Sequence, residues 1–354
     1  MARVLMKGNE AIAEAAVAAG CRYFFGYPIT PQNELPEYLS KRLPEVGGYF
    51  VQAESEVSAI NMVFGAGGSG GRVMTSSSSP GIALKQEGLS CLACAEVPSV
   101  IVNMMRGGPG IGSIQASQAD YFQTVKGGGN GDYMIPAYAP ATLQEACDLM
   151  AKAFDVAFEY RTPVMIAGDG MLGQMMEPVE IKKVDIKKHD ISWATQGRNG
   201  AKEPHIVLTA HLDADDLEAF NEYLQKKYRE IISKEVMFEE FNMDGNPEFV
   251  LVAYGTVSRI CKNAIAKLKE QGVNVGLLRP ITLWPFPSEA IARLAARPSV
   301  KAVVSVEMAA GQMMEDIKIA VNGVKPVELI YRLGSIPPSP DFIANKVIEL
   351  KGRK

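Results

Sequence analysis

Short apolar segments alternate with segments of helical pattern up to about residue 180, and this alternation constrains the fold more than any other feature. We expect strands at 21–25, 49–51, 72–75, 97–103 and 163–167. We expect helices at 9–20, 82–95 and 142–160. Such alternation predicts an α/β fold with a parallel sheet and helices on both faces. Because ligands bind outside the carboxyl ends of parallel strands, the loops that follow the strands are the candidate site segments.

A polar connection from about residue 180 interrupts the alternation before a second α/β unit begins. The connection holds a charged, periodic helix at 213–234 and ends in a linker at 242–247. Strands are then expected at 249–254, 273–278, 300–306 and 327–331, with helices at 257–270 and 288–296. Two domains are therefore predicted, at 1–235 and 247–354, which suits a chain of 354 residues.

Composition narrows the classes of protein to which the chain can belong. Lys and Arg number 36 against 40 Asp and Glu, so the basic footprint of a nucleic-acid-binding protein is absent. The 5 cysteines and 3 histidines match no zinc or iron–sulfur spacing. No apolar run is long enough to span a bilayer and the N-terminus has no signal peptide, so we expect a cytoplasmic protein without a membrane partner.

Three motifs that carry chemistry in other proteins are predicted to be structural here. Residues 65–70 match GxGxxG, but they follow a helix and precede a strand, the reverse of a nucleotide-binding loop. Residues 168–170 (Gly-Asp-Gly) resemble the start of a magnesium-diphosphate motif, but only Asn199 could continue it, so we predict a strand-end turn and no metal. Cys91 and Cys94 lie in an apolar helix without a second cysteine pair, which favours buried small side chains.

Glu54 is the carboxylate of greatest interest. It follows an expected strand and precedes a helix that soon turns apolar. An acid at this position is favoured by the helix N-terminus alone. Alternatively, a carboxylate at a strand end beside an apolar wall is short of water, which raises its pKa and suits it to share a proton with a ring nitrogen. The pattern leaves both interpretations open.

Three further segments offer groups that bind anions. Arg106 opens a glycine-rich loop after an expected buried strand, where the backbone can approach a ligand closely. Its guanidinium could hold a carboxylate through two parallel hydrogen bonds or form a structural ion pair. Thr30 is expected to cap a helix that begins at Pro31, or to hydrogen-bond a ligand instead. The serine run at 76–79 places hydroxyls beside a helix N-terminus, which favours anions.

Four motifs in a fixed order resemble the alpha subunit of 2-oxoacid:ferredoxin oxidoreductases. They lie at residues 27–31 (YPITP), 54–62 (ESEVSAINM), 74–76 with 79–81 (MTS, SPG) and 106–109 (RGGP). Residues 121–133 are most similar to the branched-chain (3-methyl-2-oxobutanoate) subgroup. The resemblance covers nearly the whole chain. It implies a thiamine-diphosphate-binding pyrimidine domain followed by a transketolase-C-terminal-like α/β domain.

The resemblance also implies roles for individual residues. Thiamine diphosphate would lie between this chain and a beta subunit that holds the diphosphate and Mg²⁺. Glu54 matches the glutamate that hydrogen-bonds the aminopyrimidine and favours its imino tautomer, with Glu56 as the alternative. Thr30 and Arg106 match residues that contact the carboxylate and oxo group of the substrate. The other cofactor-binding residues that the resemblance implies are Tyr27, Pro28, Ile29 and Ser77.

The implied activity is CoA-dependent oxidative decarboxylation of a 2-oxoacid to acyl-CoA and CO₂, with reduction of ferredoxin. The implied partners are the beta subunit, a gamma subunit, a ferredoxin-like delta subunit and ferredoxin, with [4Fe–4S] clusters on the partner subunits. A branched-chain substrate is favoured, while 2-oxoglutarate, pyruvate and a non-catalytic scaffold role stay open as alternatives. With so few cysteines, the chain alone is expected to be colourless and inactive.

Overall fold

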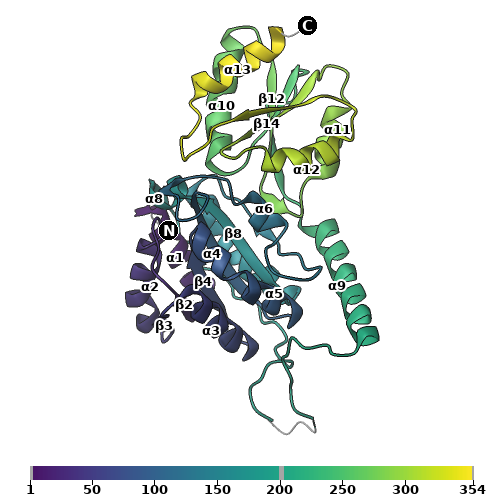
Figure 1. Ribbon diagram of the computed structural model, residues 1–354. Coiled ribbons are helices and arrows are strands. Elements are labelled where there is room, and N and C mark those ends of the chain that lie inside the picture. The colour runs from purple at the N-terminus through teal and green to yellow at the C-terminus, as the bar shows by residue number, and fades with distance from the viewer. Residues whose placement is uncertain (1–2, 199–202, 353–354) are drawn as a thin grey trace.

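The computed structural model describes residues 3–198 and 203–352 and consists of two α/β units (Figure 1). The larger unit contains the N-terminal half of the chain, and the smaller one, drawn in green and yellow, contains the C-terminal helix. None of the helices in the described residues has the length and apolarity that a membrane crossing would require.

The larger unit is built on a sheet with the strand order β13-β7-β8-β5-β4-β2-β3. Its strands from β7 to β3 are parallel, whereas β13 is antiparallel to β7 and β6 is antiparallel to β5. The strands of this sheet are β2 (Tyr23–Gly26), β3 (Tyr49–Gln52), β4 (Val73–Ser77), β5 (Ser99–Gly107), β6 (Ser113–Ala116), β7 (Ala137–Tyr138), β8 (Pro163–Asp169) and β13 (Thr282–Trp284). A separate antiparallel pair is formed by β1 (Val4–Lys7) and β9 (Met176–Val179).

Both faces of this sheet are buried, because successive side chains of a strand point to opposite faces. On β5, Val100 and Val102 pack into the core beneath α1, α2 and α7, while Ile101 and Met105 pack into the core beneath α3 and α5. The helices of the two layers are α1 (Gly8–Ala18), α2 (Glu34–Glu45), α7 (Leu143–Glu159), α3 (Glu56–Gly68), α4 (Ser79–Leu84) and α5 (Gln86–Cys94). The predicted fold class, a parallel sheet covered on both faces, is confirmed.

The smaller unit has a sheet of its own, with the order β10-β12-β11-β14-β15 and only β10 antiparallel. Helices α10 and α13 cover one face, and α11 and α12 cover the other. The elements of this unit are β10 (Phe238–Phe241), β11 (Phe249–Val252), α10 (Gly255–Glu270), β12 (Val275–Pro280), α11 (Ser288–Ala295), β14 (Ala302–Glu307), α12 (Gln312–Val321), β15 (Val327–Tyr331) and α13 (Pro340–Gly352).

The two units exchange strands across the predicted domain bounds. Strand β10 precedes residue 247 but joins the second sheet, and β13 lies within 247–354 but joins the first sheet. The end of the first domain at residue 235 and the start of the second at residue 247 therefore remain predictions. Helix α9 (Ala214–Glu235) fills the connection between the units, and its N-terminus is capped by the Asp213 carboxylate.

Two helix predictions near the strand ends are wrong. The expected helix at 82–95 is two helices, α4 and α5, that meet at the fully buried Lys85. The helix expected to begin at Pro31 begins at Glu34 instead, so Thr30 does not cap it. Thr30 is left in the loop between β2 and α2, where its backbone is free to contact other segments.

Buried polar contacts join the two units. Gln118 donates to the Tyr254 carbonyl (3.0 Å), and its own side-chain oxygen accepts from the Met308 amide (3.2 Å). Arg279, in β12, forms two 2.8 Å hydrogen bonds with the Glu145 carboxylate at the start of α7. These contacts hold the second sheet over the carboxyl end of β8, close to the loops that carry the candidate site.

Candidate cofactor and substrate site

The loops after β2, β4 and β5 meet at the carboxyl edge of the first sheet. Ser76, near the end of β4, donates a 2.5 Å hydrogen bond to the side-chain oxygen of Gln32, which follows β2. Arg106, near the end of β5, donates to the carbonyl oxygen of Thr30 at 2.8 Å. Two predicted substrate residues, Thr30 and Arg106, are therefore in contact, although 76 positions separate them in the sequence.

Arg106 is buried, with 6% of its surface exposed. Its guanidinium donates to the carbonyl oxygens of Thr30 (2.8 Å) and Ile111 (2.9 Å). Its Nε is buried without a hydrogen-bond partner among the described residues. Because a buried donor without a partner is costly, this N–H is suited to a ligand oxygen.

A polar network that the sequence did not predict binds the backbone of Arg106. Ser79 accepts from the Arg106 amide (2.9 Å) and donates to the Asp120 carboxylate (2.6 Å). Asn103 also donates to Asp120, at 3.0 Å. Burial raises the pKa of Asp120, against the two hydrogen bonds and the nearby Arg106 charge, which lower it. The position of Asn103 within an otherwise apolar strand was the available signal.

The structure decides between the two interpretations of Glu54. Its side chain is exposed and accepts hydrogen bonds from Ser58 (2.7 Å) and Ser55 (3.1 Å). These bonds lower the pKa of Glu54, so the interpretation as a desolvated carboxylate with a raised pKa is wrong at this position. The physical reason is the helix start: Ser55 is the N-cap of α3, and Glu54 lies outside the helix in solvent.

Glu56, the alternative carboxylate, is the buried one. It is the first residue of α3 and is 5% exposed. None of the described residues donates a hydrogen bond to the Glu56 carboxylate. The Glu56 carboxylate lies beside Gly81 and the Ser77 hydroxyl, and a side-chain carbon at Gly81 would clash with both. The absence of a side chain at Gly81 thus lets the Ser77 hydroxyl and the Glu56 carboxylate lie close against the backbone of α4.

Several buried polar side chains near Gly81 are unpaired. The hydroxyls of Ser77 and Ser78 are buried and have no hydrogen-bond partner among the described residues. Lys85 is fully buried and donates to the Thr75 hydroxyl at 3.1 Å. Ser77, a predicted cofactor-binding residue, therefore lies beside Glu56 in a part of the interior where several polar groups have no hydrogen-bond partner.

Tyr27, Pro28 and Ile29, the other predicted cofactor residues, form the rim of the site. Tyr27 and Pro28 are exposed and Ile29 is half-buried, in the loop that leads from β2 to Thr30. Next to them, a pocket of about 370 Å³ opens between Thr30, Gln115 and Gln174. The Thr30 side chain is exposed at this opening.

The Gly-Asp-Gly segment at 168–170 is not the predicted turn: residues 168 and 169 end β8, and residue 170 begins a helix directly. The Asp169 carboxylate caps α8 (Gly170–Gln174) by accepting from the Met171 and Leu172 amides, and it also accepts from the Thr256 hydroxyl. Burial raises the pKa of Asp169. Asn199, the possible continuation of a magnesium motif, lies outside the described residues. Residues 65–70 form the end of α3 and the turn into β4, as predicted.

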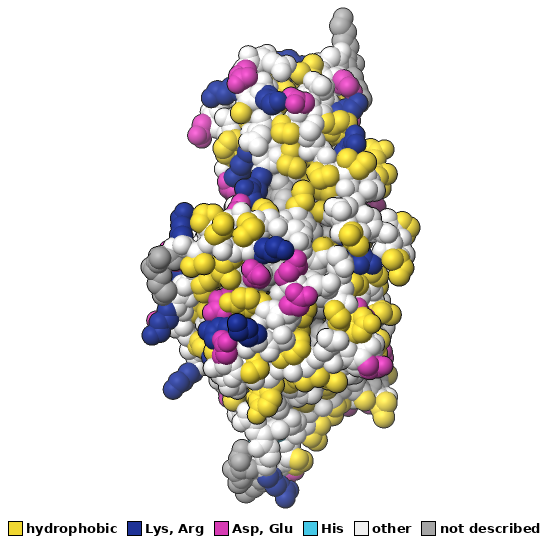
Figure 2. Space-filling model, turned by 90° about the vertical axis from the view of Figure 1, so that its left-hand side faces the viewer, with side chains coloured by type: hydrophobic (Ala, Val, Ile, Leu, Met, Phe, Trp, Pro, Cys, Tyr) yellow, Lys and Arg dark blue, Asp and Glu magenta, His cyan; other side chains and the backbone are white. Residues whose placement is uncertain are grey.

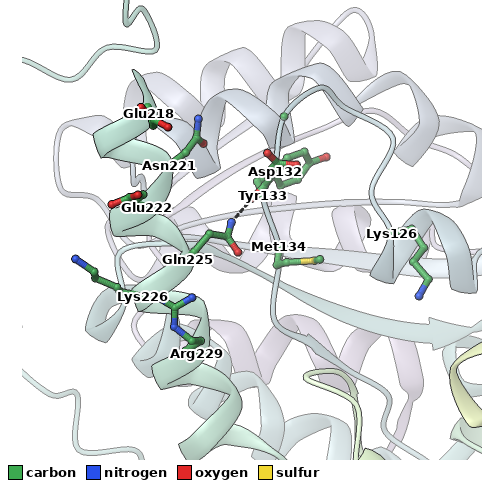
Figure 3. Close-up of a pocket in the computed structure, with 11 residues that line it drawn as sticks. Lys126, Asp132, Tyr133, Met134, Glu218, Asn221, Glu222, Gln225, Lys226 and Arg229 are labelled. Carbon is green, nitrogen blue, oxygen red and sulfur yellow. Dashed lines mark hydrogen bonds between the residues drawn. The ribbon is translucent and has the colours of Figure 1, made fainter. Parts of the chain in front are cut away.

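A larger polar groove lies elsewhere, between α9 and the loop at 126–134 (Figure 3). It has a volume of about 710 Å³, and Gln225 donates to the Asp132 carbonyl across it at 2.9 Å. Acidic and basic side chains are mixed along it, and Lys126 is paired with Asp316. None of the predicted site residues lines this groove.

Comparisons with known proteins place the chain in a family. Residues 14–239 match the family model described as pyruvate flavodoxin/ferredoxin oxidoreductase, thiamine diP-binding, and residues 247–343 match pyruvate:ferredoxin oxidoreductase core domain II. The chain is 48% identical over 353 residues to ketoisovalerate oxidoreductase subunit VorB of Methanothermobacter thermautotrophicus, covering 99% of each chain. It is 36% identical to 2-oxoglutarate synthase subunit KorA of the same organism, covering 98% of each.

Solved structures agree with this placement. The structure superposes on 2-oxoglutarate:ferredoxin oxidoreductase from Magnetococcus marinus with a TM-score of 0.87 at 25% identity. The match covers 98% of this chain but 65% of that one, so the chain spans about two thirds of that relative's length. A split-gene transketolase shares the fold at a TM-score of 0.60 and 12% identity. The chain therefore belongs to the 2-oxoacid:ferredoxin oxidoreductase family and is an alpha-type subunit of it.

Proposed function

We propose that this chain supplies the aminopyrimidine side of a thiamine diphosphate site and the groups that hold the substrate carboxylate. The observation that carries the proposal is the buried Glu56 carboxylate, which lies beside Ser77 and is left without a hydrogen bond by the described residues. Arg106, with its unpaired Nε, contacts Thr30 in the loop that follows β2, a strand separated from β5 by β4. The names of the relatives support the same class of reaction.

The residues of the site fit the pyrimidine end of thiamine diphosphate. An aminopyrimidine carries a ring nitrogen and an amino group, which need a carboxylate and hydrogen-bond acceptors. Glu56 and the unpaired hydroxyls of Ser77 and Ser78 offer these groups on buried side chains. Among the residues that the structure describes, no cluster of three acidic, His or Cys side chains is arranged to hold a metal. We propose that a beta subunit holds the diphosphate with its Mg²⁺.

Thiamine diphosphate, when bound, supplies an electron sink for the decarboxylation of a 2-oxoacid. Glu56 would hold a proton at the ring nitrogen, and its burial strengthens that hydrogen bond because the local dielectric constant is low. Arg106 would bind the substrate carboxylate through its Nε, while its two other contacts hold the guanidinium in place. Asp120 orients Arg106 through Ser79, and Thr30 borders the opening through which substrate enters.

The elements that carry the site expose apolar side chains that suit a partner subunit. Tyr49 (64% exposed) and Val51 lie on the edge strand β3, Val57 follows Glu56, and Leu84 (55% exposed) precedes Lys85. Figure 2 shows that hydrophobic side chains are exposed among charged ones on the side of the molecule that lies to the left in Figure 1. Large exposed apolar patches are typical of protein interfaces. We propose that the beta subunit covers β3 and the start of α3.

The proposed activity is CoA-dependent oxidative decarboxylation of a branched-chain 2-oxoacid, with electrons passing to ferredoxin. The gamma subunit, the ferredoxin-like delta subunit and their [4Fe–4S] clusters belong to this proposal. Its support is the 48% identity to a ketoisovalerate oxidoreductase subunit, against 36% to a 2-oxoglutarate synthase subunit. A panel of 2-oxoacids with CoA, given to the assembled complex, should yield the highest kcat/KM for 3-methyl-2-oxobutanoate. A preference for 2-oxoglutarate or pyruvate would contradict the assignment of the substrate.

Exchange of the two glutamates tests the assigned role of Glu56. In the assembled complex, Glu56→Gln should lower 2-oxoacid-dependent reduction of a viologen dye by roughly 100-fold or more, because a positioned proton-transfer group contributes about that factor. Glu54→Gln is the matched control and should stay near wild type, since Glu54 is exposed. A fully active Glu56→Gln complex would exclude the proposed role. A wild-type complex that is inactive with every 2-oxoacid would favour a scaffold subunit.

A further inference from the structure

Helix α12 of the smaller unit lies against a short helix of the larger unit, α6 (Tyr121–Val125), as Figure 1 shows. Gln312 and Asp316 of α12 make polar contacts there, and they lie on one face of α12 because they are four residues apart. Asp316 accepts from the Tyr121 hydroxyl at 2.7 Å and pairs with Lys126. The proposed function uses neither of these two α12 side chains.

The Gln312 carboxamide binds the backbone on both sides of Asp120. Its oxygen accepts from the Phe122 amide at 2.9 Å, and its nitrogen donates to the Ala119 carbonyl at 2.8 Å. Asp120 lies between these two residues, immediately before α6. Because the donor and the acceptor of one planar group are both used, the backbone around Asp120 is fixed in position and orientation relative to α12.

Asp120 in turn fixes the groups that bind the backbone of Arg106. Its carboxylate accepts from the Ser79 hydroxyl (2.6 Å) and from the Asn103 side chain (3.0 Å). The side-chain oxygen of Asn103 accepts from the Ser79 amide (3.2 Å), so the three residues form a closed ring of hydrogen bonds. The Ser79 hydroxyl also accepts from the Arg106 amide at 2.9 Å. A shift of Asp120 therefore reaches Arg106 through a single side chain.

We propose that Gln312 is a positioning residue of the substrate site. By fixing the backbone around Asp120, it holds Ser79, and through Ser79 it holds Arg106 where the substrate carboxylate binds. This inference rests on the proposed function of Arg106. Because hydrogen bonds between a guanidinium and a carboxylate depend on the orientation of the planar group, loss of the Gln312 contacts should weaken substrate binding. The second unit thereby contributes to substrate affinity, although it carries none of the predicted site residues.

Substitutions of Gln312 test this role in the assembled complex. Gln312→Met keeps the volume and removes both hydrogen bonds. It should raise the KM for 3-methyl-2-oxobutanoate roughly 3- to 10-fold, the factor by which one or two lost hydrogen bonds change an equilibrium, with a smaller change in kcat. Gln312→Asn is one methylene too short to reach both backbone groups and should give the same split between KM and kcat. An unchanged KM in both variants would overturn the inference.

Gln144→Met is the matched control. Gln144 of α7 is half-buried like Gln312, and its carboxamide also binds backbone with both atoms, accepting from the Glu180 amide (2.8 Å) and donating to the Glu180 carbonyl (3.1 Å). Its loss should lower the temperature of thermal unfolding about as much as that of Gln312 and leave KM unchanged. An equal rise of KM in the two variants would overturn the inference, because KM would then report general destabilisation.

Hydrogen–deuterium exchange follows the same connection without turnover. In the assembled complex without substrate, the Arg106 amide should exchange roughly 3- to 10-fold faster in Gln312→Met than in wild type, because its acceptor Ser79 is less firmly held. Gln144→Met should leave this rate unchanged. If Gln312 only joined the two units, exchange would rise at Phe122 but not at Arg106, and that result would overturn the inference.

Arg106→Lys distinguishes failure of this inference from failure of the proposed function. If Arg106→Lys raises KM and Gln312→Met does not, the role of Gln312 fails and that of Arg106 stands. If Arg106→Lys leaves KM unchanged, the proposed role of Arg106 fails, while faster exchange at its amide in Gln312→Met would still support the connection from α12. In the double variant, Gln312→Met should raise KM by a smaller factor than it does alone, and an equal factor would overturn the inference.

Discussion

At the scale of single residues, the chemistry depends on which polar groups are left unpaired in the interior. Glu56, Ser77 and the Nε of Arg106 are buried without hydrogen-bond partners among the described residues, while Glu54 is solvated and bound by two serines. Unpaired buried polar groups lower the stability of a fold, so their presence together at one sheet edge indicates that a ligand completes them.

The role of Arg106 can be tested by a substitution that keeps the positive charge and removes the planar guanidinium group. Arg106→Lys should raise the KM for the 2-oxoacid roughly 10- to 100-fold with a smaller change in kcat, because Lys lacks the planar donors that bind a carboxylate side by side. Steady-state kinetics of the assembled complex measures both constants. Arg42→Lys, which alters the ion pair between Arg42 of α2 and Glu14 of α1, is the control and should leave KM unchanged. A KM equal to wild type in Arg106→Lys would remove this residue from the carboxylate site.

At the scale of elements, the site depends on where each helix begins. The apolar alternation was sufficient to predict the strands β4, β5 and β8 and the helix α7, because each has a strong local pattern. It was not sufficient to place the N-cap of α3 at Ser55 or to split α4 from α5 at Lys85. Both features depend on which side chains tertiary packing buries, and a shift of two residues exchanged the buried glutamate for the exposed one.

Gly81, in α4, tests the packing between α3 and the end of β4. Gly81→Ala should weaken thiamine diphosphate binding to the assembled complex by at least about tenfold, because the added carbon clashes with Ser77 and Glu56. Calorimetric titration of the cofactor-depleted complex measures this. Gly65→Ala is the control within α3: its added carbon meets nothing within 4 Å and should stabilise the helix by up to about 1 kcal/mol. Equal cofactor affinity in the two variants would contradict the geometry of the site.

At the scale of the whole molecule, the two α/β units share one junction. Strands β10 and β13 cross the boundary that local pattern predicted, and Gln118, Arg279 and Thr256 make contacts between the units. Contacts between residues far apart in the sequence do not affect local hydrophobic periodicity. The sequence pattern therefore predicted the two units but not the contacts between them. The same holds for the contact between Thr30 and Arg106, which the resemblance grouped by role and the fold joins by a hydrogen bond.

The junction can be tested through the Thr256 hydroxyl, which donates to the buried Asp169. Thr256→Val should lower the free energy of unfolding by about 1–3 kcal/mol at pH 7, whereas Thr256→Ser should keep most of it. The hydroxyl stabilises the ionised carboxylate, so its loss raises the pKa of folded Asp169 further above its usual range. The folded variant then holds the proton to a higher pH than the folded wild type, and the cost grows as the pH rises through the pKa of folded wild-type Asp169. Urea unfolding at pH 4 and 7 should show it; a cost independent of pH would contradict this assignment.

The most direct measurement of the central claim is a structure of the assembled complex with thiamine diphosphate bound. The distance that matters joins a carboxylate oxygen of Glu56 to the ring nitrogen of the aminopyrimidine. We expect a hydrogen bond of roughly 3 Å there, with Glu54 in solvent and a partner subunit holding the diphosphate. An aminopyrimidine bound to Glu54, or out of reach of Glu56, would contradict the account.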